Sequence, residues 1–192
     1  MTKLIILTSL VAQFCVASAS GASTAPMKPA MLAETALVAE QSAVAQNSNR
    51  ILVEDMQKIA GTLWRGKLTY LDYSANVLRS IPSNLLVAES KDDSSIWLWS
   101  YGYDDEPHAN AKDGIKLSAD GRQLGDENLI ERRVTEDGTL ILVTSMSGQD
   151  DKRQAQFRFT YTITKNAFTR QKEVKLESGG DYFVRHTYAW TR

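Results

Sequence analysis

The chain has 192 residues, of which 43% are hydrophobic, and its charge is nearly balanced, with 22 Lys and Arg against 23 Asp and Glu. Without Lys3, which falls in a predicted leader, the formal charge is −2, and there is no concentrated run of basic residues, so nucleic acid is a poor candidate partner. Cys15 is the single cysteine, which excludes an internal disulfide and a cysteine metal site.

Residues 1–19 have the pattern of an export signal. Lys3 precedes an apolar run from Leu4 to Val16, and Ala17-Ser18-Ala19 is a small-residue cleavage site. The run is short of the roughly 20 residues that cross a bilayer, so we expect an exported protein, periplasmic or extracellular, with no stable membrane span. Lipoprotein processing at Cys15 is the alternative, but the bulky Phe14 before it does not fit a lipobox.

Two further segments precede the predicted sheet. Residues 20–49 are rich in Ala, Ser and Gln and predict a linker or a weak helix, because the apolar positions are mostly alanine. Residues 50–60 place Ile51, Met56 and Ile59 close to one helical face, which predicts a short helix packed on the strands after it. We therefore expect residues 50–192 to form one domain that includes this helix.

After Gly61 the hydrophobic period becomes two, which is typical of β-strands. Asp137-Gly138 is a strong hairpin signal, Pro82-Ser83-Asn84 predicts a break, residues 104–114 a long acidic loop, and residues 147–152 a polar turn. Short connections favour antiparallel neighbours, and a meander of this many twisted strands tends to close. The fold class is therefore all-β, a lipocalin-like barrel of about eight to ten strands, with strands expected at 64–70, 77–81, 85–90, 96–103, 115–118, 129–135, 139–146, 157–164, 168–177 and 182–191.

The strand from Ile96 to Tyr103 places four aromatic side chains on one face: Trp97, Trp99, Tyr101 and Tyr103. Each buries about 150 to 250 Å², so leaving this face in water is implausible. It either fills a core or lines a cavity. Gly66, on the same face as Trp64, leaves room in the interior and favours a cavity, as do tyrosine hydroxyls that would be costly in a dry core.

The alternation of side chains between the two faces of a strand tests whether the sheet closes into a barrel. In a closed meander the first and last strands pair antiparallel, so Trp64 would lie beside the end that carries Trp190 and Arg192. Leu68 and Tyr70 would then lie opposite the region 184–186. Both strands turn aromatic faces to one side, which a barrel interior explains.

At this point the chain resembles the calycin group of barrels, which includes lipocalins, fatty-acid-binding barrels and haem-binding barrels. The resemblance is carried by the short helix before Gly61, by Gly61-Thr62-Leu63-Trp64 leading into the first strand, by the meander and by the terminal Arg192. Lipocalins begin their first strand with Gly-x-Trp and cover that tryptophan with an arginine. The resemblance thus implies a cation-π pair of Arg192 over Trp64. This chain has one extra residue between Gly61 and Trp64.

His186 is the most informative single residue. Parity places it on one face with Tyr182, Val184, Tyr188 and Trp190, an apolar setting that favours a neutral ring. By analogy with haem-binding barrels it is a candidate axial ligand of haem iron. The alternative is a core histidine hydrogen-bonded to a neighbour such as Tyr70.

Other site patterns are weak or missing. Asp104, Asp105, Glu106 and His108 could hold a hard cation, but the spacing matches no EF-hand, and solvated loop acids are the simpler interpretation. There is no Gly-x-Ser-x-Gly elbow, phosphate-binding loop or His-Glu-x-x-His, so we assign no catalytic residue and no metal site, and an enzyme is not favoured.

The sequence therefore predicts an exported barrel that binds a small hydrophobic or amphipathic molecule in its interior, with no cofactor. Two alternatives remain open: a haem-binding barrel that uses His186, and a solid-cored interaction module without a small ligand. The candidate ligand-binding residues are Trp64, Tyr70, Trp97, Trp99, Tyr101, Tyr161, His186 and Tyr188.

Overall fold

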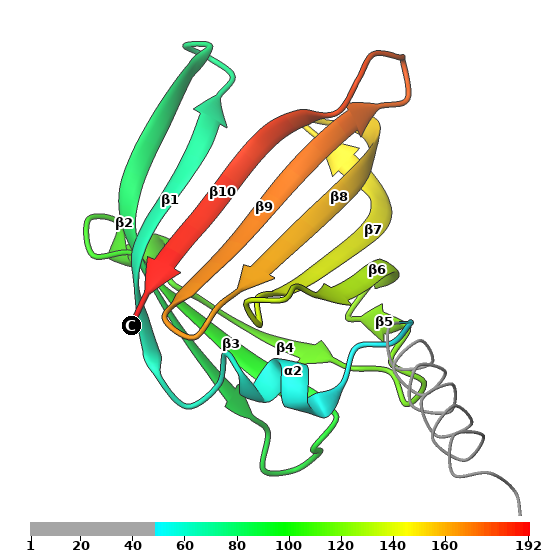
Figure 1. Ribbon diagram of the computed structural model, residues 1–192. Coiled ribbons are helices and arrows are strands. Elements are labelled where there is room, and N and C mark those ends of the chain that lie inside the picture. The colour runs from blue at the N-terminus through cyan, green and yellow to red at the C-terminus, as the bar shows by residue number, and fades with distance from the viewer. Residues whose placement is uncertain (1–48) are drawn as a thin grey trace, which may run out of the picture. The chain divides into compact units, whose positions relative to one another are not determined.

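The computed structural model describes residues 49–192, so the predicted signal peptide and nearly all of the predicted linker lie outside the described residues. Within this range the chain forms one ten-stranded antiparallel sheet preceded by one short helix, as predicted (Figure 1). The elements are α2 (Val53–Gln57), β1 (Leu63–Asp72), β2 (Val77–Glu89), β3 (Ile96–Gly102), the 3-10 turn η1 (Pro107–Ala109), β4 (Ala111–Lys116), β5 (Gln123–Leu124), β6 (Glu127–Val134), β7 (Leu140–Asp150), β8 (Arg153–Ile163), β9 (Ala167–Leu176) and β10 (Phe183–Thr191).

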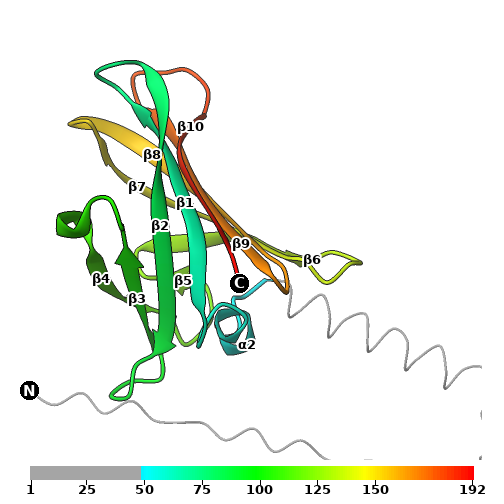
Figure 2. The same ribbon diagram turned by 90° about the vertical axis from the view of Figure 1, so that its left-hand side faces the viewer.

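The sheet curls into a nearly closed barrel. The spatial order is β4-β3-β2-β1-β10-β9-β8-β7-β6-β5, so the first and last strands pair, as the parity argument requires. Their register runs from Arg65 opposite Thr191 to Tyr70 opposite His186. The two ends of the sheet meet at a bridge between Leu117, which directly follows β4, and Leu124 of β5. Figure 2 shows the curled sheet from the side. A meander with tight turns thus forms a barrel with one short seam.

Several strand boundaries differ from the prediction. β2 runs unbroken through Pro82, which is tolerated because β3 pairs with β2 only from Asn84 onward, so Pro82 lies where no β3 neighbour needs its missing N–H. β7 continues to Asp150 and turns at Asp151 and Lys152, which both have positive φ, as the favoured two-residue hairpin demands. β4 begins at Ala111, inside the predicted acidic loop.

The Asp137-Gly138 hairpin is confirmed. Gly138 has a φ of 81°, and the Gly138 N–H donates to the carbonyl of Thr135 over 2.9 Å. Asp137 also accepts hydrogen bonds from the backbone N–H and the hydroxyl of Thr139. The turn is therefore fixed by local side-chain contacts as well as by glycine.

Helix α2 closes one end of the barrel. The side chains of Ile51, Met56 and Ile59 are buried in the core, as the helical pattern predicts. The buried Asp55 carboxylate caps the helix by accepting from the Leu52 N–H over 2.8 Å, and it forms a two-point ion pair with Arg132 of β6 at 2.7 and 2.8 Å. A helix of five residues is too short to be stable alone, so these tertiary contacts hold it.

At the helix end the core contains a cluster of aromatic rings. Phe168 lies at its centre, with Trp64 at 5.9 Å, Trp99 at 6.0 Å and Trp190 at 5.2 Å between ring centroids. All four side chains are fully or almost fully buried. The aromatic faces therefore do enclose one shared space, and at this end they fill it.

The Arg192 guanidinium lies 4.5 Å over the ring of Trp64, as the resemblance implied. The indole N–H of Trp64 donates to the Ile59 carbonyl over 2.8 Å, so this tryptophan contacts both the segment that follows α2 and the C-terminal Arg192.

We expect Arg192→Ala to lower the melting temperature by about 2 °C, because an exposed cation-π contact contributes about 0.5–1 kcal/mol to a domain of this size. Thermal unfolding followed by circular dichroism measures this. Arg122→Ala, at an exposed position in the turn between β4 and β5, should change it less, and equal shifts would argue against the contact.

A β-bulge between Val184 and His186 corrects one part of the prediction. The extra residue, Arg185, reverses the alternation, so Val184 is 43% exposed instead of sharing the interior face with His186. Phe183 packs against the core in its place. The sequence carries no clear signal for such an irregularity.

No helix among residues 49–192 is both long enough and apolar enough to pass through a membrane.

Candidate functional site

A cavity of about 400 Å³ opens at the barrel end opposite α2. This mouth is where the β1–β2 hairpin and the β9–β10 turn lie, at the top of Figure 1. Apolar side chains form one part of its wall and ionisable side chains the other. The lining residues are Leu68 and Tyr70 of β1, Ile81 of β2, Tyr103, Glu106 and Ala109 after β3, Asp150 of β7, Lys172 of β9, and Arg185 and His186 of β10.

Strand register explains how these side chains meet. Tyr70 lies directly opposite His186, and His186 lies directly opposite Lys172, so one row crosses β1, β10 and β9. Directly opposite residues have Cβ atoms about 4.5–5.5 Å apart. The bulge lets Arg185 reach the cavity as well, although it is adjacent to His186 in sequence.

His186 is held in its neutral form. Burial lowers its pKa to about 3, and the positive charges of Arg170, Lys172 and Arg185 act in the same direction, with Asp150 opposing them. Its Nε2 atom is buried and has no hydrogen-bond partner among the described residues, so this nitrogen does not make the hydrogen bond to Tyr70 that the alternative interpretation offered. The ring instead contacts the edge of Tyr188, at 5.4 Å between centroids.

This pKa makes stability depend on pH. An unfolded histidine binds a proton below about pH 6.5, whereas folded His186 stays neutral down to about pH 3. Between these two pH values the unfolded state binds more protons, so the free energy of unfolding falls as the pH drops. The wild-type protein should lose free energy of unfolding between about pH 7 and about pH 5, as measured by urea unfolding. We expect this loss to be smaller by about 1–2 kcal/mol in His186→Gln. His108→Gln, in the exposed loop, is the control. An unchanged profile in His186→Gln would contradict the assignment.

Lys172 is the second unusual group in the cavity. Burial lowers its pKa, partly offset by Asp150, and the charges of Arg170 and Arg185 lower it further. Its Nζ atom lies 3.6 Å from the centroid of the Phe157 ring. Within residues 49–192 this ammonium forms no ion pair with a carboxylate.

The rim of the cavity is a polar cluster around Asp150. The Tyr73 hydroxyl donates to one carboxylate oxygen, and the Arg185 Nε lies 3.4 Å from the other. The Arg185 guanidinium also stacks 4.2 Å over the Tyr73 ring and donates to the Leu71 carbonyl. Burial and the Asp150 carboxylate raise the pKa of Tyr73 to about 12, so the hydroxyl stays a donor. Both carboxylate oxygens of Asp150 therefore already have a partner.

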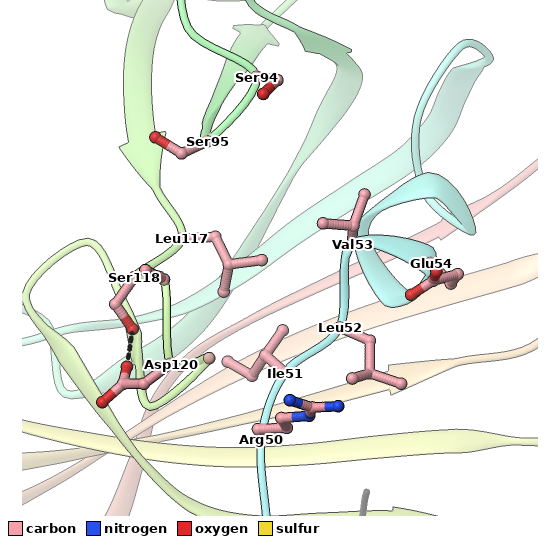
Figure 3. A pocket seen from close by; sticks show the side chains of 12 residues that line it. Arg50, Ile51, Leu52, Val53, Glu54, Ser94, Ser95, Leu117, Ser118 and Asp120 are labelled. Atoms are coloured by element: carbon pink, nitrogen blue, oxygen red, sulfur yellow. Dashed lines mark hydrogen bonds between the residues drawn. The ribbon is translucent and has the colours of Figure 1, made fainter.

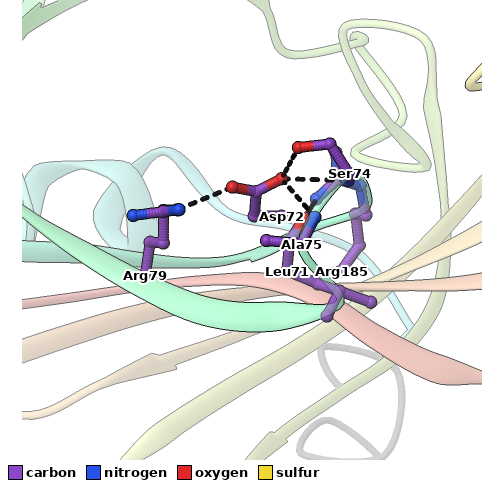
Figure 4. Close-up of polar contacts among 6 residues, drawn as sticks. All are labelled: Leu71, Asp72, Ser74, Ala75, Arg79 and Arg185. Carbon is purple, nitrogen blue, oxygen red and sulfur yellow. Dashed lines mark hydrogen bonds and ion pairs between the residues drawn. The ribbon is translucent and has the colours of Figure 1, made fainter.

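The β1–β2 hairpin above this rim is fixed by Asp72 (Figure 4). Its carboxylate accepts from the Ser74 hydroxyl over 2.6 Å, from the Ser74 and Ala75 N–H groups, and from Arg79 Nε over 2.6 Å. These contacts, led by the Ser74 hydroxyl and Arg79, hold the pKa of Asp72 well below its usual range. The hairpin thus forms a defined wall of the mouth.

A buried polar network lies below the cavity. Arg170 of β9 donates to Glu127 of β6 over 2.7 Å and to the Tyr161 hydroxyl over 3.0 Å, and that hydroxyl donates to Glu127 over 2.7 Å. The Thr144 hydroxyl donates to the same carboxylate. Burial acts to lower the pKa of Arg170, but Tyr161 and Glu127 outweigh it and raise this pKa. Arg170 is therefore a structural cation whose charge still acts on the cavity.

The predicted binding residues separate into three groups. Tyr70 and His186 line the cavity. Tyr188 lies one layer deeper, where its hydroxyl hydrogen-bonds that of Tyr103 over 2.7 Å. The remaining five pack in or against the core below: Trp64, Trp97, Trp99, Tyr101 and Tyr161.

Sequence reasoning missed the charged members of the lining, Lys172, Arg185 and Asp150. Charged residues on strands normally face solvent, and nothing in the pattern of β9 marks Lys172 as inward. The available signal was the pairing of β9 with β10, which places Lys172 beside His186 once the register is known.

A second hollow, of about 320 Å³, lies beside α2 and the turn between β4 and β5 (Figure 3). Its polar groups bond to one another: the Ser118 hydroxyl donates to Asp120 over 2.6 Å, and the Ile51 N–H donates to the Gly121 carbonyl over 2.8 Å. Such internally satisfied groups do not single it out as a ligand site. The acidic loop likewise contributes to no cluster of three or more potential metal ligands among residues 49–192.

No known family model matches the sequence, and no curated protein matches it significantly. Among solved structures, the chain is similar to a protein of unknown function from the DUF3598 family of Nostoc punctiforme PCC 73102. The two share 13% identity with a TM-score of 0.43, and the match covers 76% of this chain and 51% of the other. This chain thus spans about half the length of that protein.

Proposed function

We propose that this protein is an exported, calycin-like barrel that binds a small amphipathic molecule in the cavity at its mouth. The observation that carries the proposal is the cavity of about 400 Å³ whose wall combines the apolar side chains of Leu68 and Ile81 with ionisable side chains such as Lys172. A ligand would place its apolar part against Leu68 and Ile81. Its polar end would face His186 and Lys172.

The apolar surface that a ligand could bury in the cavity is large enough to drive binding. Burying about 200 Å² of apolar ligand surface stabilises a complex by about 5 kcal/mol before the entropic cost of association. A hydrogen bond from the Lys172 side chain would add to this, because Lys172 lines the cavity and forms no ion pair within residues 49–192. The packed core below limits the ligand to a small molecule.

Two features support the calycin-like and exported parts of the proposal. The helix leading into a meander, with an arginine over the first-strand tryptophan, matches the arrangement by which lipocalins are recognised. The leader pattern in residues 1–19 supports export. In addition, residues 49–192 contain no cysteine, so the stability of the domain depends on no disulfide in an oxidising or a reducing compartment.

The test is mass spectrometry of organic extracts from the natively purified protein and two variants of β2. Ile81→Trp fills the cavity, whereas Leu78→Trp adds the same side chain at a position that is 69% exposed and outside the cavity. We expect a compound to co-purify with the wild type and with Leu78→Trp but not with Ile81→Trp. No compound, or one retained equally by all three, would favour the solid-cored interaction module.

Haem binding is the second candidate function, and the place of His186 in the cavity lining favours it. A neutral imidazole is the form that ligates haem iron. On adding hemin we expect a Soret shift that His186→Ala abolishes and His108→Ala leaves unchanged. No shift, or a shift that persists in His186→Ala, would remove this candidate.

A further inference from the structure

The geometry points to a covalent attachment site at Lys172: its ε-amine forms a reversible imine with an aldehyde carried by a small apolar molecule in the mouth cavity. This inference rests on the proposed ligand-binding function and names the chemical class of the ligand.

The surroundings of Lys172 are those of an activated amine. Desolvation and neighbouring cations are the two ways in which proteins make a lysine nucleophilic. Arg170 lies two residues away on the same face of β9, and Arg185 lines the same cavity. The setting is also apolar: the Nζ atom lies 3.6 Å from the centroid of the Phe157 ring, and Phe159 is directly opposite Lys172 in β8.

The nearby acid does not neutralise this lysine. Asp150 is held by Tyr73 and Arg185, and Lys172 forms no ion pair in the part of the chain that the structure describes. The lowered pKa of Lys172 increases the neutral fraction of its amine, about tenfold for each pH unit by which the pKa falls. His186, directly opposite, is also neutral and so leaves the amine free of a counter-charge.

The reaction needs no further reagent. The lone pair of the neutral amine attacks the carbonyl carbon, and a C–N bond forms to give a carbinolamine. Loss of the hydroxyl group then leaves a C=N bond, and both amine protons depart with the carbonyl oxygen as water. No oxidant or reductant takes part, and water reverses the step.

An aldehyde fits the cavity better than a carboxylate does. Even when Lys172 is protonated, Lys172 and Arg185 face two acids in the lining, Asp150 and Glu106, and His186 is neutral, so there is no net positive charge to hold an anion. An uncharged carbonyl loses less hydration on entering than a charged carboxylate. The apolar wall at Leu68 and Ile81 then receives the rest of the molecule.

The experiment treats the purified protein with equimolar cinnamaldehyde and sodium cyanoborohydride, which reduces the imine and fixes the label. Intact mass gives the number of cinnamyl groups, and peptide mapping gives their positions. Lys175→Met, at an exposed position three residues along β9, is the matched control for Lys172→Met, and circular dichroism checks that both variants fold. Cinnamyl alcohol, which cannot form an imine, measures non-covalent binding by calorimetry.

We expect one label, located at Lys172, that is lost in Lys172→Met and retained in Lys175→Met. A label spread over exposed lysines, or retained in Lys172→Met, overturns the imine; if cinnamyl alcohol still binds in that case, the proposed ligand function stands. Absence of binding by the alcohol together with absence of labelling at Lys172 counts against both.

Discussion

Replacing Gly66 by alanine is expected to lower the free energy of unfolding by about 3 kcal/mol, the upper range for forcing extra atoms into packed structure. A Cβ at this position would overlap the Ala189 carbonyl oxygen and lie only 2.8 Å from the Ala189 carbonyl carbon and the Trp190 Cα. All three are backbone atoms of β10, so no side chain can rotate away. The pairing of β1 with β10 that closes the barrel would have to shift. Urea unfolding measures the loss.

Gly102→Ala in β3 is the matched control, because a Cβ there meets only the Asn84 Cβ at an ordinary 3.8 Å. Both substitutions restrict the unfolded chain equally. Gly102→Ala should therefore change stability by about 0.5 kcal/mol or less. Similar losses in the two variants would contradict the close approach of β10 to β1.

Replacing Glu127 by alanine is expected to cost about 3–5 kcal/mol, because it leaves the Arg170 guanidinium buried without a counter-charge. The carboxylate also accepts hydrogen bonds from the hydroxyls of Tyr161 and Thr144, which would lose their partner. The side chains of Glu127 and Arg170 are only 9% and 15% exposed, so water can replace little of what is lost. Equilibrium unfolding in urea is the measurement.

Glu131→Ala, on the same strand, provides the comparison. Glu131 pairs with Arg133 at 2.7 Å, but about half of each side chain is exposed, and such pairs contribute about 0–1 kcal/mol. Replacing both Glu127 and Arg170 by leucine should recover much of the loss, since no charge is then left unpaired. Equal losses for Glu127→Ala and Glu131→Ala would show that the buried network is not required.

The amino-acid pattern was a good guide to the strands and a poorer guide to their ends. Alternation located all of the long strands, and Asp137-Gly138 marked its hairpin correctly because only a residue that tolerates positive φ fits there. The break predicted at Pro82 was wrong, because the cost of a missing N–H depends on whether a neighbouring strand needs it. Which residues of β2 have a neighbour in β3 is decided by the tertiary structure, so the sequence alone did not show that Pro82 is tolerated.

Gly66 illustrates the same limit. Its small size was interpreted as room for a ligand, but the backbone of β10 takes that space. Glycine in a strand indicates either a void or a close backbone approach. The sequence alone does not distinguish the two, because the approaching strand lies more than a hundred residues away in the chain.

The sequence by itself determined the all-β meander and the short helix before it, which follow from local periodicity and turn chemistry. The alternation of side chains along the first and last strands was consistent with their pairing, and the contact of Arg192 with Trp64 was implied by the resemblance to lipocalins. Only the tertiary structure decided which part of the interior is filled and which is open. An aromatic face looks the same in sequence whether it packs a core, as Trp99 does, or borders a cavity, as Tyr70 does. The cavity is the space left between side chains of several strands, and its row of Tyr70, His186 and Lys172 exists only through the register of β1, β10 and β9 and the bulge beside Arg185.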